Sequence, residues 1–282
     1  MRRGRCRPVI FVNPLDFLRV TPRTNCGSCG HPTCLAFAVA VTKGGADPAL
    51  CPHLPPDALA ATGNLVPGAG LARVERGQEE RDMALVAHLK SKVNVLDYPA
   101  IAPRLGAACI PGPPAALRFR YLNRQVQISG EEGRLEGGEL IDPRDQILLY
   151  NYVASGGGEA PRNEWVGMES LPNSMAKVRT LAAYCEQPLA RRFAGRREAL
   201  ARACRLLGAL PGPEGQSADL GLILPVLPFV PLYLLFWDAE PAEGFACRIK
   251  MLFDRRVLDF LDIESLIFAT ERMAERLMEL DG

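Results

Sequence analysis

Residues 24–52 read TNCGSCGHPTCLAFAVAVTKGGADPALCP, and this stretch decides how the N-terminal part of the chain folds. Its four cysteines, Cys26, Cys29, Cys34 and Cys51, have the spacing C-x2-C-x4-C-x16-C. Three thiols within nine residues, followed by a fourth from a later loop, are typical of a chain that wraps an iron–sulfur cubane. The spacing therefore predicts that these four cysteines are the ligands of a [4Fe-4S] cluster.

Two other interpretations of these cysteines stay open at this point. Zinc also takes four cysteines, but zinc sites typically use two short C-x2–4-C pairs, whereas the third and fourth cysteines here are 17 positions apart. The second alternative is four ordinary buried thiols. Gly27 and Gly30 favour the cluster, because glycine lets the backbone curl tightly and lets amide groups approach the cluster sulfides.

Composition limits the class of protein. The chain has 282 residues, of which 48% are hydrophobic, enough for one large or two ordinary domains. Nine cysteines, an odd number, argue against a secreted disulfide framework, and a net charge of +1 gives no preference for nucleic acid. No stretch of about 20 apolar residues exists, so we expect no membrane span and interpret the protein as cytoplasmic.

The first 62 residues are predicted to form a small, mostly helical cluster-binding domain. Asn13 is expected to cap a short helix that continues to residue 18, with Pro14 in its first turn. A second helix is expected from Pro32-Thr33 to about Lys43, and because it is apolar all round we expect it to be buried. Residues 52–70 are rich in Pro, Gly and Ala and form the best candidate for a domain boundary.

Residues 71–282 are predicted to form a larger domain, in which helices and strands come in blocks. Helices are expected over 71–92, from Asp142-Pro143 to 156–158, over 174–210 with breaks near Pro188 and Gly195, and over 262–280. Strands are expected in a hairpin over 117–128 with Asn123-Arg124 at its turn, and over 220–224, 232–237 and 245–253. This order favours an α+β fold with an antiparallel sheet.

Three prolines, Pro225, Pro228 and Pro231, recur every three residues in the longest apolar run of the chain. One interpretation is a rigid wall of a ligand pocket near Trp237. The interpretation that we favour is a strand that enters the core with its prolines at an edge, because an apolar run is first a core signal.

A family resemblance is carried by residues 13–54, which include PLDFLRVTPRTNCGSCGHPTCLAFAVAV and the later CP. This segment resembles the N-terminal iron–sulfur domain of the corrinoid iron–sulfur protein large subunit, and its cysteine spacing also resembles the cluster domain of the Rnf-type B subunit. The resemblance implies that the four cysteines named above are the cluster ligands. In the corrinoid family, the cluster passes an electron to cobalt.

The rest of the chain is similar to an uncharacterised domain family found in anaerobes. The likeness is carried by LPVLPFVPLYLLFWDAEPAEGFACRIKMLFD, residues 224–254, and by LDIESLIFATERMAERL, residues 261–277. That family supplies no assigned activity, so it adds organisation to the prediction but no mechanism.

Together these features predict a redox accessory protein that transfers single electrons to a partner protein. The resemblance makes a corrinoid protein in anaerobic metabolism one such partner. The alternatives are an iron–sulfur enzyme with a small-molecule site near Trp237, and a binding module in which the metal only holds the fold. The sequence identifies no catalytic residues and does not fix an oligomeric state.

Overall fold

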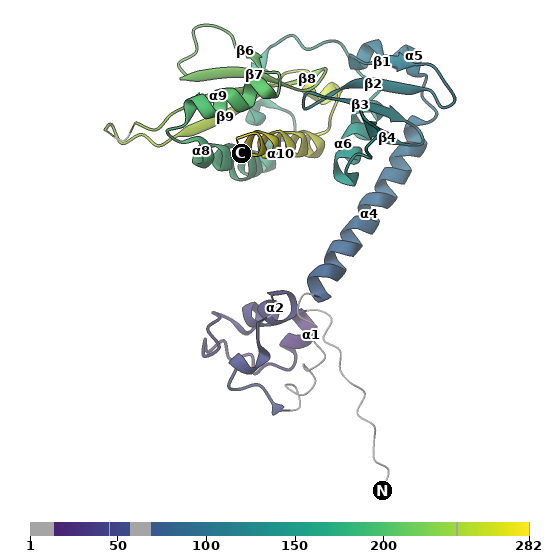
Figure 1. Ribbon diagram of the computed structural model, residues 1–282. Helices are drawn as coiled ribbons and strands as arrows, with labels where there is room; N and C mark the ends of the chain where they lie inside the picture. The colour runs from purple at the N-terminus through teal and green to yellow at the C-terminus, as the bar shows by residue number, and fades with distance from the viewer. Residues whose placement is uncertain (1–13, 45, 57–68, 241, 282) are drawn as a thin grey trace. The chain divides into compact units, whose positions relative to one another are not determined.

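The computed structural model describes residues 14–44, 46–56, 69–240 and 242–281. The chain forms two compact units, Met1–Arg81 and Asp82–Gly282 (Figure 1). Helix α4 (Ala69–Val93) begins in the first unit and ends in the second, which confirms the charged helix predicted over 71–92. Asn13, predicted to cap the first helix, lies outside the described residues.

The smaller unit is helical. It contains α1 (Pro14–Leu18), α2 (Cys34–Gly44) and the 3-10 turn η1 (Pro48–Leu50). The rings of Phe17 and Phe37 meet edge to face with their centroids 6.0 Å apart, and both side chains are buried. Edge-to-face contact is a favourable arrangement of aromatic rings, so this pair joins α1 to α2. The two predicted helices are confirmed.

The prediction that α2 is buried on all sides is wrong. Phe37, Ala38 and Val41 face the core, but Leu35 and Val39 are 44% and 41% exposed. These two residues lie four positions apart and share one face of the helix. A unit this small has a single core, which covers only one side of α2.

The larger unit contains two antiparallel sheets, which confirms the predicted α+β class. One has the strand order β1-β2-β3-β4 and the other β5-β9-β8-β7-β6. The first sheet is made of β1 (Ala108–Ile110), β2 (Ala116–Tyr121), β3 (Arg124–Ser129) and β4 (Gly133–Leu135). The second is made of β5 (Trp165–Val166), β6 (Leu210–Pro211), β7 (Leu220–Leu227), β8 (Val230–Trp237) and β9 (Arg248–Asp254).

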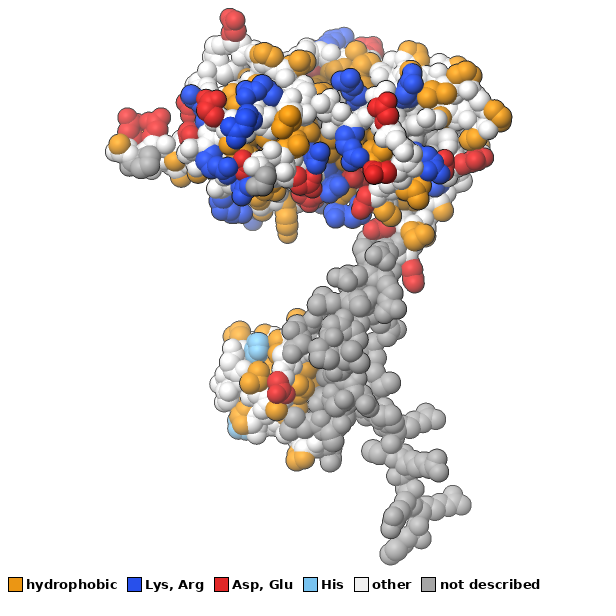
Figure 2. Space-filling view, viewed as in Figure 1, with side chains coloured by type: hydrophobic (Ala, Val, Ile, Leu, Met, Phe, Trp, Pro, Cys, Tyr) orange, Lys and Arg blue, Asp and Glu red, His pale blue; other side chains and the backbone are white. Residues whose placement is uncertain are grey.

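Helices and short turns cover these sheets (Figure 1). The helices are α5 (Tyr98–Ile101), α6 (Pro143–Ala154), α7 (Met175–Leu181), α8 (Gln187–Phe193), α9 (Arg197–Leu206) and α10 (Ile263–Glu279). The turns are η2 (Pro103–Leu105), η3 (Met168–Ser170), η4 (Ala182–Glu186) and η5 (Val257–Asp259). One continuous hydrophobic core joins both sheets to the helices, and it includes Cys185 and Cys204 as buried thiols. Acidic and basic side chains alternate over the visible face of this unit (Figure 2).

The predicted hairpin over 117–128 is confirmed as β2 and β3, but its turn lies one residue earlier than predicted. Tyr121 pairs with Arg124, so the turn residues are Leu122 and Asn123, with φ of 47° and 61°. Positive φ at both positions matches the right-handed twist of a two-residue hairpin, and asparagine tolerates it well. Leucine tolerates it poorly, and tertiary contact holds it there: the Leu122 amide donates to the carbonyl of Val226 on β7 at 3.0 Å.

The helical stretch predicted over 174–210 is interrupted at Gly195 as expected, but Pro188 does not break it. Residues 182–186 form one turn of π-helix, and Pro188 lies in the first turn of α8 directly after it. A proline ring collides with the carbonyl four residues earlier in a regular α-helix. The wider π turn removes that collision, so the chain continues in helical form.

Two of the three prolines of the apolar run, Pro225 and Pro231, lie in strands in the interior of the sheet, and Pro228 lies in the turn between those strands. Pro225 of β7 lies opposite Pro231 of β8, and a register irregularity follows Pro225. The short strand β6 pairs only with Leu222 and Ile223, and the β8–β9 pairing begins at Leu232. Pro225 therefore lies outside the β6–β7 pairing, and Pro231 lies outside the β8–β9 pairing. Because neither position needs to donate to those neighbouring strands, the missing N–H groups cost no sheet hydrogen bond.

Candidate metal centre

The four predicted ligands differ in exposure. Cys34 is the first residue of α2 and Cys51 directly follows η1, and both are buried. Cys29 is partly exposed and packs against the small core, whereas Cys26 is exposed. The described cysteines are all free thiols. We call residues 22–33 the cysteine loop. The four sulfur atoms thus come from this loop, from the start of α2 and from the residue after η1.

The backbone of the cysteine loop coils repeatedly through the left-handed region. Asn25, Gly27 and Gly30 have φ of 52°, 74° and 81°. A Cβ atom built at Gly30 would meet nothing within 4 Å, and one at Gly27 would meet only the His31 carbonyl at 3.9 Å. The glycines are therefore required by backbone conformation, and the space beside each remains open. The tight backbone curl expected at both glycines is confirmed.

Two side chains fix the loop to the start of α2. The Cys34 amide donates to the Asn25 Oδ1 atom at 2.9 Å, and the Ala36 amide donates to the Thr33 Oγ1 atom at 3.0 Å. Asn25 and Thr33 thereby satisfy two of the amides that a helix start leaves without intrahelical partners. The positive end of the helix dipole lies at Cys34 and favours negative charge there. Thr33 directly precedes the helix and carries the cap signal that a sequence can show, whereas Asn25 acts from nine positions before Cys34, where no such signal exists.

Hydrogen bonding favours the charged form of the most exposed cysteine. The Ser28 side chain, the Ser28 amide and the Thr24 side chain lower the pKa of the Cys26 thiol to about 7. Hydrogen bonds to a thiolate stabilise it relative to the thiol, and the thiolate is the form that binds metal. Of the two histidines near the ligands, His31 lies against the Phe37 ring with centroids 5.5 Å apart, and His53 is exposed.

The donor set suits iron–sulfur chemistry, because four thiols, open glycine positions and a helix start lie in one short segment. Within the described residues, no three His, Cys, Asp or Glu side chains are arranged as a metal-binding group. The ligand assignment therefore rests on the chemistry of the donors and remains a prediction.

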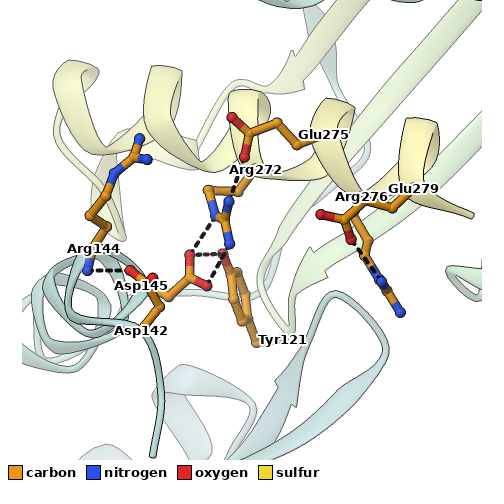
Figure 3. Close-up of polar contacts among 8 residues, drawn as sticks. All are labelled: Tyr121, Asp142, Arg144, Asp145, Arg272, Glu275, Arg276 and Glu279. Atoms are coloured by element: carbon orange, nitrogen blue, oxygen red, sulfur yellow. Dashed lines mark hydrogen bonds and ion pairs between the residues drawn. The ribbon is translucent and has the colours of Figure 1, made fainter.

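The larger unit holds a polar cluster that the sequence analysis did not identify (Figure 3). Asp145 on α6 accepts hydrogen bonds from Arg272 Nε at 2.7 Å and from Arg272 Nη2 at 2.9 Å. It also accepts one from the Tyr121 hydroxyl at 2.9 Å. Arg272 additionally pairs with Glu275 on the same helix. Burial, with the Asp145 charge beside it, raises the pKa of Tyr121 far above its ordinary value, so this hydroxyl remains a donor.

This polar cluster joins three elements, β2, α6 and α10, and each charge in it has a partner. Arg272 and Asp145 lie 127 positions apart in the sequence, so no local pattern reveals their contact. A hydrogen-bonded network of this kind specifies how the elements pack. Trp237, the residue near which a substrate site was predicted, is covered by the Arg248 guanidinium at 4.1 Å from its ring centroid.

Comparison with known proteins identifies the larger unit. Residues 97–276 match the family described as a domain of unknown function, DUF3786. The chain belongs to the DUF3786 family. In this member, residues 22–53 also match a family described as "Putative Fe-S cluster", and that span contains all four cysteines of the cysteine loop and its flanks. This second match supports an iron–sulfur cofactor.

Two curated relatives are similar to part of this DUF3786 protein. The corrinoid/iron-sulfur protein large subunit of Moorella thermoacetica is 41% identical over 73 residues, which cover 23% of this chain and 16% of that protein. The B subunit of the ion-translocating oxidoreductase complex of Alcanivorax borkumensis is 33% identical over 80 residues, which cover 28% of this chain and 40% of that protein. The chain thus spans less than half the length of either relative. No solved structure matches the chain.

Among the described helices, none combines the length and the apolar character needed to cross a bilayer. The longest, α4, carries many charged residues.

Proposed function

We propose that the protein is a redox accessory protein in which Cys26, Cys29, Cys34 and Cys51 hold one [4Fe-4S] cluster. The observation that carries the proposal is the cysteine set, which lies in a segment matching an iron–sulfur family and begins a helix at Cys34. A cluster bound there would supply single-electron transfer. The four thiolates of the chain would hold the cluster, and the start of α2 and the amides of the cysteine loop would stabilise the negative charge that reduction adds.

The electron acceptor in this proposal is another protein. Both relatives are named as subunits, one of a corrinoid/iron-sulfur protein and one of an ion-translocating complex. A corrinoid protein in anaerobic metabolism is the acceptor that we favour, since the likeness to that relative is the higher in identity. We place this exchange in the cytoplasm, where thiols stay reduced, and assign cluster binding to residues 1–62 and partner or ligand binding to residues 71–282.

The test is to substitute a ligand and count iron. Protein purified without oxygen should hold about four iron and four sulfide per chain, and dithionite should produce the EPR signal of a reduced cubane. Cys34→Ser should lose most of the iron, because a hydroxyl is a poor ligand for this cluster. Cys247→Ser is the matched control, because Cys247 is a partly exposed thiol of the larger unit, and it should keep full iron content.

The alternatives give different results in the same experiment. A colourless protein with one zinc would replace this proposal by a metal-stabilised binding module. Equal iron loss in Cys34→Ser and Cys247→Ser would overturn the ligand assignment.

A further inference from the structure

A groove of about 550 Å³ opens in the larger unit beside the β2–β3 hairpin. One wall is formed by the outer face of that hairpin, a second by residues 106–108, and the floor by the end of β7 and the turn that follows it. This volume lies within the range of sites that bind small organic molecules. It is called the hairpin groove below.

The walls of the hairpin groove are held in place before any ligand binds. The buried Tyr152 hydroxyl donates to the Leu105 carbonyl at 2.7 Å and accepts from the Phe229 amide at 3.3 Å, which links two walls. Gly106 has φ of 61°, and a Cβ there would lie 2.7 Å from Pro228. Only glycine permits this approach of the two segments. A preformed site lowers the entropy that a ligand must lose on binding.

Two arginines project into the hairpin groove from a single strand. Arg118 and Arg120 of β2 are exposed and flank the buried Phe119, so both leave the same face of the sheet. Neither forms an ion pair with any residue that the structure describes, and the groove lining contains no Asp or Glu. Two amide side chains lie beside Arg120: its Nη1 donates to Asn123 Oδ1 at 3.4 Å, and Gln125 lies opposite it across the strands.

This arrangement differs from that of other arginines in the same unit. Arg272 is bound by Asp145, Arg134 by Glu132 and Arg256 by Glu159. Two guanidinium groups that share one cavity without a carboxylate repel each other, and an anion bound between them would relieve that repulsion. Arg118 also lines an adjoining hollow of about 280 Å³, whose lining includes Glu136 and Arg134, so the space without a carboxylate is the hairpin groove itself.

The floor of the hairpin groove determines what else the anion must carry. It is apolar, and Pro225, Leu227 and Pro228 contribute to it. Of the three prolines, Pro225 lies in β7 and Pro228 in the turn after it, and both line the groove, whereas Pro231 and Trp237 do not. An inorganic anion would leave this floor in contact with water, whereas an apolar group would cover it.

We propose that the hairpin groove binds a small organic anion, a carboxylate or phosphate ester with an apolar body. Arg118 and Arg120 bind its charged group, and the proline floor covers its apolar body. This site lies in the DUF3786 domain and does not depend on the cluster.

The test uses four probes on the full-length protein with its cluster: phenyl phosphate, benzoate, benzyl alcohol and inorganic phosphate. Binding is followed by NMR shifts of the groove amides and by titration calorimetry. Phenyl phosphate or benzoate should bind with a roughly millimolar Kd, as expected for probes of this size. Benzyl alcohol and inorganic phosphate should bind at least about tenfold more weakly, because each lacks one of the two recognised groups.

Variants connect this binding to the named residues. Arg118→Gln and Arg120→Gln should each weaken the anionic probe about tenfold, and both exposed substitutions should leave folding and iron content unchanged. Arg202→Gln, at an exposed arginine of α9, is the matched control and should bind like the parent protein. Ala108→Trp should block the groove, since Ala108 is exposed in its wall.

Three outcomes would overturn the proposal. They are no binding of either organic anion, binding that is equal in Arg118→Gln and Arg202→Gln, and shifts that lie outside the groove. Each can occur while the iron count and the EPR signal remain as predicted, so failure of this inference is distinguishable from failure of the proposed redox function.

Discussion

Replacing Asp145 by alanine tests whether the polar cluster of Tyr121, Asp145 and Arg272 holds the larger unit together. The Asp145 side chain is 12% exposed and accepts three hydrogen bonds, two of them from the Arg272 guanidinium. Its removal leaves a buried hydroxyl and a largely buried positive charge without their partner. Breaking a buried ion pair in this way typically costs about 3–5 kcal/mol.

Two features of the structure place the expected cost of Asp145→Ala at the low end of this range. Arg272 keeps its ion pair with Glu275, and a hollow of about 250 Å³ beside the carboxylate admits water. We therefore expect a loss of about 3 kcal/mol in the free energy of unfolding. Glu279→Ala is the matched control on the same helix, because it removes the more exposed ion pair with Arg276, and it should cost at most about 0.5 kcal/mol.

Urea denaturation followed by tryptophan fluorescence measures this loss in the larger unit alone. The chain has two tryptophans, Trp165 and Trp237, and both lie in that unit. With a denaturant dependence of about 2 kcal/mol per molar urea, the midpoint for Asp145→Ala should fall by about 1.5 M. If Asp145→Ala and Glu279→Ala unfold at the same urea concentration, the polar cluster contributes little and the reasoning fails.

Two further substitutions test other parts of the structure. Burial raises the pKa of Glu186 above its usual value, so its contribution to stability falls as pH rises above about 4.5 through the folded pKa. Glu186→Gln keeps an acceptor for the Met251 amide but cannot ionise. The decrease of the urea midpoint between pH 4 and pH 8 should therefore be smaller in this variant than in the parent protein. An equal decrease in both proteins would contradict the burial argument. Gly30→Ala forces a Cβ into φ of 81°, costs about 1–2 kcal/mol, and should speed iron loss to a chelator about tenfold. Gly244→Ala, at a similar φ in a hairpin of the larger unit, is the control and should leave the rate of iron loss unchanged. Equal rates of iron loss in Gly30→Ala and Gly244→Ala would contradict a role of the Gly30 conformation in holding the cluster.

The elements that could be predicted from the sequence are those whose ends carry a local signal. Asp142-Pro143 begins α6 because the Asp142 carboxylate accepts from the Arg144 amide at 2.8 Å and proline suits the first helical turn. Gly27 and Gly30 have the positive φ that their place between the cysteines predicts. The predicted cysteine set also lies within a span that matches an iron–sulfur family.

The predictions that failed were decided by a distant contact, by the geometry of a preceding turn, or by the number of layers around a helix. The hairpin turn includes Leu122, a residue unsuited to positive φ, because the Val226 carbonyl on β7 accepts its amide. Pro188 sits within a helical run because a π turn precedes it. The exposure of Leu35 and Val39 depends on how many layers surround α2, and helix periodicity carries no information about that.

Short-range features of the chain are enough to predict where helices begin and that strands and helices occur in blocks, and the proposed iron ligands also rest on them. Hydrogen bonds and backbone preferences over a few residues set all of these. The contact of Asp145 with Arg272, and the groove that Arg118 and Arg120 share with the β7 prolines, emerge only in the folded molecule. These contacts join segments about 100 or more positions apart, and they form only when the packing of a common core brings the segments together.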